Sequence, residues 1–149
     1  MGRMARVMAT GVFDLLHIGH LHYLREAKRL GDELVVVIAT DETVRKRKHN
    51  PIIPQDMRRE LVEALKPVDK AVIGHADDPL KIVEEIDPDI IALGYDQDAG
   101  DLERRLRERG IGAKVVRCTR YSDYDLNGTR KIIKKIEEKI EKDELYKGT

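Results

Sequence analysis

The sequence is poor in the residues that several common kinds of site require. Its only cysteine is Cys118, which excludes an intramolecular disulfide and a cysteine-rich zinc site. It has no tryptophan and one phenylalanine, so aromatic contacts to a ligand must come mostly from its five tyrosines. No apolar run approaches the roughly 20 residues that cross a bilayer, and the first residues contain no apolar segment typical of a secretory signal. We therefore expect a cytoplasmic protein with no membrane partner.

Net charge is also absent. The chain has 28 basic and 28 acidic residues, so no overall positive field attracts nucleic acid, and none is expected as a partner. Charged residues make up 38% of the chain, well above the ~25% that is usual, which leaves room for local charged patches. A chain of 149 residues is long enough to bury one hydrophobic core, and we expect a single domain over residues 1–149.

What the sequence does contain is a regular alternation of apolar runs and helical patterns. Five runs rich in valine and isoleucine are typical of buried parallel strands, and they cover residues 5–10, 33–40, 70–74, 89–94 and 113–118. Segments with a helical spacing of apolar residues separate them, and these cover residues 20–30, 54–66, 79–86 and 101–110. This order predicts an α/β fold with a doubly wound, Rossmann-like sheet of five parallel strands. A last helix from Thr129, with isoleucines along one face, is expected to pack on the sheet.

Ligands of such sheets bind beyond the carboxyl ends of the strands, where the winding reverses. The segments that follow the strands are therefore the candidate site, and they cover residues 10–20, 40–50, 74–78, 94–100 and 118–128. The first of them is the most informative. It reads GVFDLLHIGH over residues 11–20 and leads directly into a predicted helix.

His17 and His20 lie three residues apart where this loop enters the helix, so both rings can face one cavity. The N-terminus of a helix has free N–H groups and a partial positive charge, which together attract phosphate. Gly11 and Gly19 allow a nucleotide to approach the backbone closely. We predict a triphosphate site in which His17 and His20 are catalytic, donating to charge that grows as pyrophosphate leaves.

Two other interpretations of this histidine pair are open. A histidine near a helix start is often only a cap or a surface residue, and a pair at this spacing can bind a metal, although no third ligand stands at a fixed short spacing. His22 points around the helix from the other two and is interpreted as incidental. Cys118, at the end of a strand, is interpreted as a buried small residue rather than a redox switch.

The segment GVFDLLHIGH closely resembles the G-T-F-D-x-x-H-x-G-H signature of the cytidylyltransferase-like nucleotidyltransferases. Residues 24–42, 52–74 and 87–98 resemble further segments of the same family, so the resemblance covers roughly residues 5–135. The tetrapeptide HIGH also marks class I aminoacyl-tRNA synthetases. Those proteins need several hundred residues and a KMSKS loop, which this chain lacks.

The resemblance implies roles for individual residues. Val12 and Phe13 would lie on the nucleotide, Asp14 would support the loop, and Asp96 would meet the ribose or the base. Residues 120–129 would close over the triphosphate, with Tyr121 and Tyr124 either stacking on a ring or anchoring the loop. The implied nucleotide-binding set is Gly11, Val12, Phe13, Asp14, His17, Ile18, Gly19, His20, Asp96, Arg120, Tyr121, Tyr124 and Thr129.

Within the family, the whole chain most resembles the archaeal FAD synthetases, which are similar to the glycerol-3-phosphate cytidylyltransferases. This resemblance implies transfer of AMP from ATP to FMN, giving FAD and pyrophosphate. A divalent cation, typically Mg²⁺, would be held by the substrate phosphates, with no dedicated protein ligands. Residues 120–132 read RYSDYDLNGTRKI, where bacterial cytidylyltransferases have R-T-x-G-I-S-T-T, and this departure argues against a strict glycerol-phosphate enzyme.

The acceptor is the least constrained part of the prediction. The basic run VRKRKH follows the second predicted strand, and its Lys46 and Lys48 are candidates for binding the acceptor phosphate, as is Arg58 at a nearby helix start. A cytidylyltransferase acting on a small phosphorylated alcohol stays open as an alternative. So does a nucleotide-binding sensor without turnover, and a homodimer is left open as well.

Overall fold

The computed structural model describes residues 4–47 and 49–145. Its centre is one sheet of five parallel strands in the order β3-β2-β1-β4-β5. The strands are β1 (Arg6–Gly11), β2 (Glu33–Ile38), β3 (Lys70–Ile73), β4 (Ile90–Leu93) and β5 (Lys114–Arg117). The chain winds from β1 to β3 in one direction and returns to the other side of β1 with β4, so the switch point lies between β1 and β4.

Side chains that alternate along the central strands divide the core into two layers. On β1, Val7 and Ala9 join one buried cluster and Met8 joins the other. On β2, Val36 and Val37 separate in the same way. Both faces of each central strand are therefore buried, which explains why the sequences of these strands are unbroken apolar runs.

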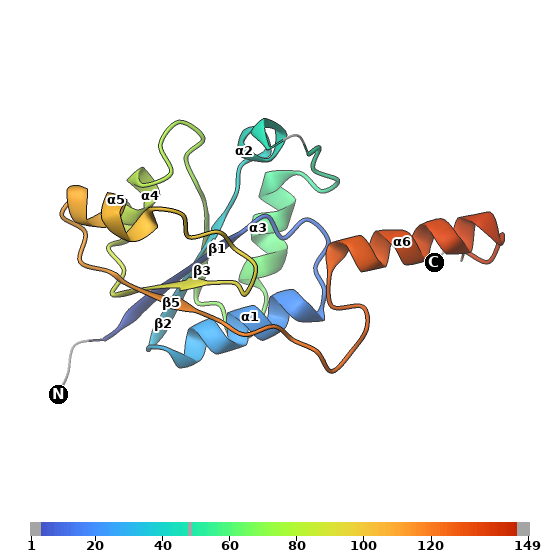
Figure 1. Cartoon of the computed structure of the whole chain (residues 1–149), viewed down its shortest axis with the longest axis horizontal. Coiled ribbons are helices and arrows are strands. Elements are labelled where there is room, and N and C mark those ends of the chain that lie inside the picture. The colour runs from blue at the N-terminus through green and yellow to red at the C-terminus, as the bar shows by residue number, and fades with distance from the viewer. Residues whose placement is uncertain (1–3, 48, 146–149) are drawn as a thin grey trace.

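Helices cover both faces of the sheet (Figure 1). α1 (Ile18–Arg29) and α3 (Gln55–Glu63) pack in the first cluster, while α4 (Lys81–Ile86) and α5 (Leu102–Glu108) pack in the second. A short helix, α2 (Asp41–Lys46), follows β2 at its carboxyl end and was not expected from the sequence. The predicted doubly wound, Rossmann-like α/β fold is confirmed. No helix of the described part of the chain is long and apolar enough to cross a membrane.

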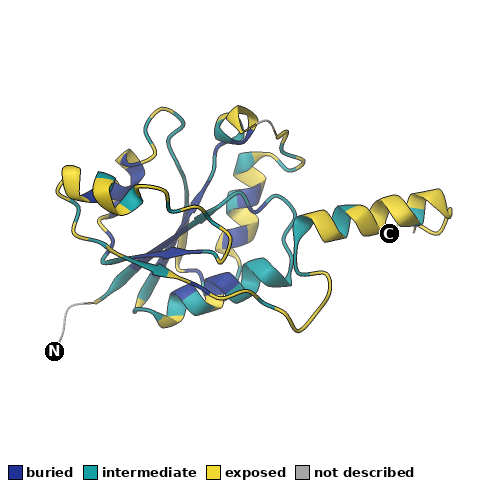
Figure 2. Cartoon of the chain, in the orientation of Figure 1, coloured by how far each residue is buried: buried dark blue, intermediate teal, exposed yellow. Residues whose placement is uncertain are grey.

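The prediction for the last helix is wrong. α6 (Thr129–Glu141) does form, but it projects away from the sheet instead of packing on it (Figure 1). None of its thirteen residues, all of which the structure describes, is buried, and most are exposed (Figure 2). The apolar stripe that predicted packing on the sheet is present, but the loop after β5 carries the helix past the edge of the body.

Candidate active site

The loop between β1 and α1 holds the two predicted catalytic histidines in one arrangement. His17 is the N-cap of α1, and its Nδ1 accepts hydrogen bonds from the backbone N–H groups of Gly19 at 3.1 Å and His20 at 3.4 Å. The Nδ1 of His20 in turn accepts from the backbone N–H of His17 at 3.3 Å. A nitrogen that accepts has no proton, so each neutral ring carries its proton on Nε2. The helix cap thus uses the backbone N–H groups of this turn within the protein and leaves two side-chain donors at the start of α1.

The two rings are stacked, with centroids 3.7 Å apart and an interplanar angle of 22°. Burial lowers the pKa of His17, and burial followed by the charge of His17 lowers the pKa of His20 to about 3. Both imidazoles are therefore neutral at physiological pH in the free protein. Two neutral imidazoles can stack without the electrostatic repulsion that two charged rings would have. A neutral imidazole can still donate a hydrogen bond to an incoming phosphate oxygen.

Packing around these rings explains the two glycines of the loop. Phe13 is buried against the His20 ring, with centroids 5.1 Å apart, and its backbone has a φ of 55°. A Cβ on Gly11 would lie 2.8 Å from the Phe13 ring, and a Cβ on Gly19 would lie 2.5 Å from the carbonyl oxygen of Asn127. Gly19 therefore lets the end of the 118–128 segment lie directly on the start of α1.

Asp14 supports the neighbouring loop, as the family resemblance implied. Its carboxylate accepts from the backbone N–H groups of Ile52 at 2.9 Å and Ile53 at 2.8 Å. These contacts join the first loop to the segment that leads into α3. The carboxylate is thus used within the protein, and it fixes the wall of the site.

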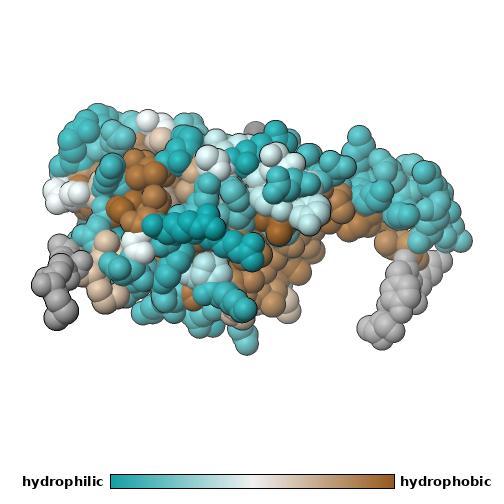
Figure 3. Space-filling view, turned by 90° about the horizontal axis from the view of Figure 1, so that it is seen from below, coloured by the Kyte–Doolittle hydropathy of each residue, from teal (hydrophilic) through white to brown (hydrophobic). Residues whose placement is uncertain are grey.

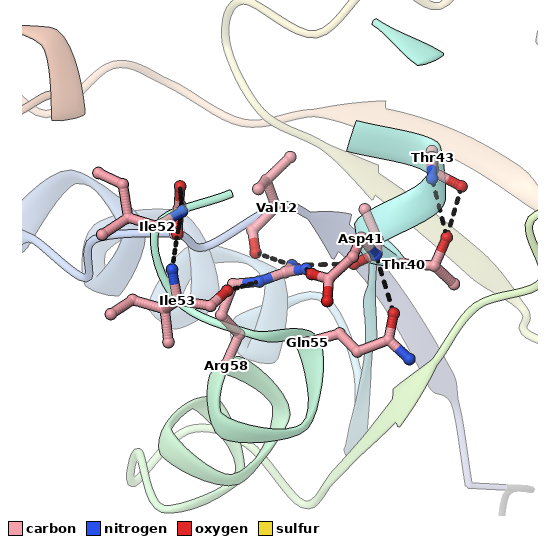
Figure 4. Close-up of polar contacts among 10 residues, drawn as sticks. Val12, Thr40, Asp41, Thr43, Ile52, Ile53, Gln55 and Arg58 are labelled. Carbon is pink, nitrogen blue, oxygen red and sulfur yellow. Dashed lines mark hydrogen bonds and ion pairs between the residues drawn. The ribbon is translucent and has the colours of Figure 1, made fainter. Parts of the chain in front are cut away.

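Arg58 lies under this wall, and its predicted contact with an acceptor does not fit the structure (Figure 4). Its side chain is 0% exposed. The guanidinium donates to the carbonyl oxygens of Ile53, Val12 and Ala39 at 2.7–2.8 Å and forms an ion pair with Asp41 at 2.7 Å. Partial burial opposes ionisation of Asp41, but the bonds from Arg58 and Gln55 outweigh it and lower its pKa. Arg58 is therefore a structural cation that holds three loops together.

Of the two lysines predicted to bind the acceptor phosphate, the structure describes only Lys46. Lys46 is exposed at the end of α2, where its Nζ lies 3.4 Å from the carbonyl oxygen of Ala76 in the segment after β3. It also lies 3.5 Å from a Glu42 carboxylate oxygen. Lys46 is therefore at the carboxyl edge of the sheet, as predicted, and free to turn toward an anion. Lys48 lies outside the described residues.

The segments after β4 and β5 meet on the other side of the switch point. The Arg120 guanidinium lies over the ring of Tyr95, 5.6 Å from its centroid, and Arg117 donates to the carbonyl oxygens of Gly94, Tyr95 and Gln97. Gln97 bridges back to β1 by donating to the carbonyl oxygen of Thr10 at 3.0 Å. Within this assembly Asp96 is exposed, so its carboxylate is available to a ligand.

Two side chains of α1 hold the start of the last loop, and sequence reasoning missed both. The Glu26 carboxylate accepts from the backbone N–H of Thr119 at 2.7 Å and from its hydroxyl at 2.5 Å. His22, interpreted as incidental, lies 3.1 Å from the same hydroxyl oxygen and stacks obliquely near Tyr121. Partial burial opposes ionisation of Glu26, but the bonds from Thr119 outweigh it and lower its pKa. The spacing of four residues between His22 and Glu26 was the only sequence signal for this pair.

Replacing Glu26 with alanine is expected to raise the KM for ATP about tenfold, because one charge-assisted hydrogen bond and a second bond to Thr119 are lost and Arg120 is no longer held. Steady-state kinetics with ATP varied would measure this. Glu60→Ala, at an exposed glutamate on α3, is the matched control and should leave the KM unchanged. An unchanged KM in Glu26→Ala would show that the anchor does not position the loop.

An open cavity of about 490 Å³ lies beside His17, between the first loop and the last. It is mostly apolar, and its lining residues are Leu16, His17, Ile18, Tyr124, Asp125, Leu126 and Ile132. Tyr121 lies behind Tyr124, with ring centroids 6.0 Å apart. Thr129 begins α6 directly after the loop. The structure thus brings Ile18 and Tyr124 to the cavity beside His17, while Thr129 is not among the residues that line it.

Two remaining predictions concern sulfur and metal. Cys118 is 7% exposed, and burial, with the nearby Glu26 charge, raises its pKa to about 11, so the thiol stays protonated. This agrees with a buried structural residue. Within residues 4–47 and 49–145, no group of three or more His, Cys, Asp or Glu side chains is arranged to hold a metal ion.

Comparisons with known proteins agree with this arrangement. Residues 8–144 match the family model described as cytidylyltransferase-like. A protein of Aciduliprofundum boonei named FAD synthase is 61% identical over 145 residues, which cover 96% of each chain. A protein of Thermoplasma acidophilum with the same name is 55% identical over 139 residues, covering 92% of this chain and 97% of that one.

Solved structures show the same fold. A crystal structure from Thermoplasma volcanium, titled as a lipopolysaccharide core biosynthesis protein, is 52% identical and superposes with a TM-score of 0.78 over 80% of this chain and 100% of that chain. A pantoate-beta-alanine ligase from Francisella tularensis superposes with a TM-score of 0.58 at 14% identity, over 80% of this chain and 61% of that one, which shows the fold alone. With its HIGH loop, its winding and these relatives, the chain belongs to the cytidylyltransferase-like family, in the group that includes the proteins named FAD synthase.

Proposed function

We propose that this protein is an ATP:FMN adenylyltransferase that forms FAD and releases pyrophosphate. The observation that carries the chemistry is the pair of stacked, neutral histidines whose Nε2–H donors stand at the N-terminus of α1. The relatives named FAD synthase, at 50–61% identity over most of the chain, support the choice of nucleotide and acceptor.

In this reaction an oxygen of the FMN phosphate attacks the α-phosphorus of ATP. A new P–O bond forms as the bond to the bridging oxygen breaks, and pyrophosphate leaves with the electron pair. Charge grows on the departing oxygens, and His17 and His20 donate to it from fixed positions. No nucleophilic side chain is needed, because the acceptor phosphate supplies the attacking atom.

The nucleotide is proposed to span the switch point. The residues of the first loop, from Gly11 to His20, would border its phosphates, and Asp96 would meet the ribose or base. Arg120 and Thr129 would close over the triphosphate from the last loop. The exposure of Asp96 and the anchoring of the last loop on α1 support this placement.

The acceptor phosphate is proposed to bind at Lys46, whose ammonium group is exposed beside the segment after β3. Lys48 stays a prediction. Tyr121 and Tyr124 are proposed as aromatic contacts, since the mostly apolar cavity beside His17 is suited to a flat ring.

A divalent cation, Mg²⁺ by preference, is proposed to bind through the substrate phosphates and to neutralise part of their charge. No step is assigned to a protein-bound metal, because the described residues offer no cluster of ligands. We propose further that residues 1–149 act as one domain, supported by the single five-stranded sheet that carries every part of the site.

A coupled assay of pyrophosphate release tests the function. ATP and CTP are each paired with FMN, glycerol 3-phosphate and phosphopantetheine, and we expect release only with ATP and FMN. Release with CTP and glycerol 3-phosphate would instead favour the cytidylyltransferase alternative. Nucleotide binding without release in any pair would favour a sensor.

A further inference from the structure

β1 and β4 part from each other before they leave the sheet. Their pairing ends at Ala9 and Ala92, whereas β1 stays paired with β2 as far as Gly11. β4 likewise stays paired with β5 as far as Leu93. Each strand thus keeps its outer neighbour while an opening forms between the two, and the loop that carries the histidines starts at this opening.

Two side chains take the place of the next two bonds of the β1–β4 ladder. In a parallel ladder of this register, the Thr10 N–H would donate to the carbonyl oxygen of Ala92, and the Gly94 N–H would donate to the carbonyl oxygen of Thr10. Instead, the Tyr23 hydroxyl accepts from the Thr10 N–H at 3.1 Å and donates to the carbonyl oxygen of Ala92 at 2.6 Å. The Gln97 amide donates to the carbonyl oxygen of Thr10 at 3.0 Å and accepts from the Gly94 N–H at 2.6 Å.

These bridges keep the opening between β1 and β4 in place. Tyr23 is 8% exposed, and burial raises the pKa of its hydroxyl, so the proton that it donates is retained. The main-chain groups at the opening all have a hydrogen-bond partner, so separating the strands leaves none of them unsatisfied. Each bridge puts two hydrogen bonds in series where the ladder would have one, which sets the strands wider apart.

Gln97 also fixes the turn that follows β4. Its backbone N–H donates to the carbonyl oxygen of Gly94 at 3.3 Å, and Arg117 of β5 donates to the same oxygen at 3.0 Å. Asp96 lies within this turn and is exposed. Its carboxylate is therefore held beside the opening between β1 and β4, where it can accept from the hydroxyl groups of a ribose.

The two sides of the histidine pair differ in chemistry. Hydrophobic surface gathers where the body of the protein meets α6 (Figure 3), and the cavity beside His17 lies there, with Ile132 of α6 in its wall. The opening between β1 and β4 is bordered instead by a hydroxyl, an amide and a carboxylate. A nucleoside, whose sugar and base both form hydrogen bonds, fits the polar side, which leaves the apolar side to a flat ring.

We propose that Tyr23 and Gln97 are positioning residues for the nucleotide, which hold the carboxyl ends of β1 and β4 apart and fix Asp96 at the opening. The nucleoside of ATP then enters a preformed site, so no strand contacts have to break when it binds. The identity of the nucleotide rests on the proposed function, while its placement rests on the two bridges. Neither side chain takes part in the bond changes at phosphorus, so both act on binding and not on the chemical step.

Gln97→Met is expected to raise the dissociation constant of a non-hydrolysable ATP analogue about tenfold, because methionine keeps the length of the side chain and loses both main-chain bonds. At saturating ATP, kcat should change by less than about threefold, since the loss of uniform binding raises KM alone. The matched control is the other glutamine of the chain, Gln55, which accepts from the Asp41 N–H at 2.8 Å after β2. Gln55→Met should leave the dissociation constant unchanged.

Tyr23→Phe separates a positioning role from a purely structural one. Without the hydroxyl, the Thr10 N–H can pair directly with the carbonyl oxygen of Ala92, so the strands close by one step and the ladder gains the bond that the bridge replaced. We expect the dissociation constant of the ATP analogue to rise about tenfold while the midpoint of urea denaturation stays nearly unchanged. A lower midpoint with unchanged nucleotide affinity would show that Tyr23 serves the fold alone.

Calorimetric titrations of ATP and CTP analogues without FMN keep this inference apart from the proposed function. Weaker nucleotide binding in both variants supports the positioning role whichever acceptor the enzyme uses, and pyrophosphate release only with another acceptor overturns the proposed function alone. A wild type that binds the CTP analogue instead should show the same changes with CTP. Unchanged affinity in either variant overturns the positioning role, and a wild type that binds neither nucleotide overturns both proposals.

Discussion

His20→Ala is expected to lower kcat for adenylyl transfer by about 10²–10³-fold while changing the dissociation constant for ATP little. In the proposed reaction the Nε2–H of His20, the ring nitrogen left free by the bond at Nδ1, donates to charge that develops only as pyrophosphate leaves, so the loss falls on the transition state. Steady-state kinetics combined with calorimetric titration of a non-hydrolysable ATP analogue separates the two quantities.

His17 needs a different substitution, because it also caps α1. His17→Ala would remove the acceptor for two backbone N–H groups, whereas His17→Asn keeps an oxygen for them and removes the Nε2 donor. His75→Ala, at a histidine paired with Glu85, is the matched control and should keep wild-type kcat. If kcat survived in His20→Ala and ATP affinity collapsed instead, the histidine would be a binding group and not a transition-state donor.

Arg58→Met is expected to destabilise the folded protein by about 3–5 kcal/mol, because it removes one partner of a buried ion pair and leaves three carbonyl oxygens without their donor. Chemical denaturation followed by circular dichroism measures the free energy of unfolding. Arg58→Lys should recover little of it, because a single ammonium group cannot reach carbonyls on three loops at once.

Arg59 gives the matched control for this change. It is the next residue of α3, is partly exposed, and has one ion pair, with Glu63 at 3.4 Å. Arg59→Met should change the free energy of unfolding by no more than about 0.5 kcal/mol. Equal losses at the two positions would mean that the buried contacts of Arg58 contribute no more than a surface charge.

The sheet could be predicted from the sequence because both faces of its strands are buried, which makes each strand a continuous apolar run. The histidine pair was predictable because the helix start, the glycines and the imidazoles occupy one short stretch. Arg58 could not be placed in the same way. A single arginine at a helix start reads equally as a ligand for phosphate and as a buried partner for carbonyls, and only the fold of three separate loops decides between them.

The anchors of the last loop and the direction of α6 escaped prediction for a related reason. Glu26 and Thr119 are 93 positions apart, so no local pattern marks them as partners. The isoleucine stripe of α6 predicts that one face of the helix packs against other apolar side chains, but it does not indicate which part of the structure supplies them. Sequence periodicity fixes which side chains share a face, while the path of the preceding loop fixes where that face points.

The central position of β1 has a consequence for how the chain folds while it is synthesised on the ribosome. The part that contains β1, α1, β2, α3 and β3 is made first, and it brings together most of one buried cluster. Until β4 is made, the N–H and C=O groups along the second edge of β1 are unpaired and can pair with a strand of another chain. β4 then covers that edge, with the Tyr23 hydroxyl donating to the carbonyl oxygen of Ala92 at 2.6 Å. The histidines are made before that event and Arg120 after it, so the proposed site is incomplete in a nascent chain until its last strands dock.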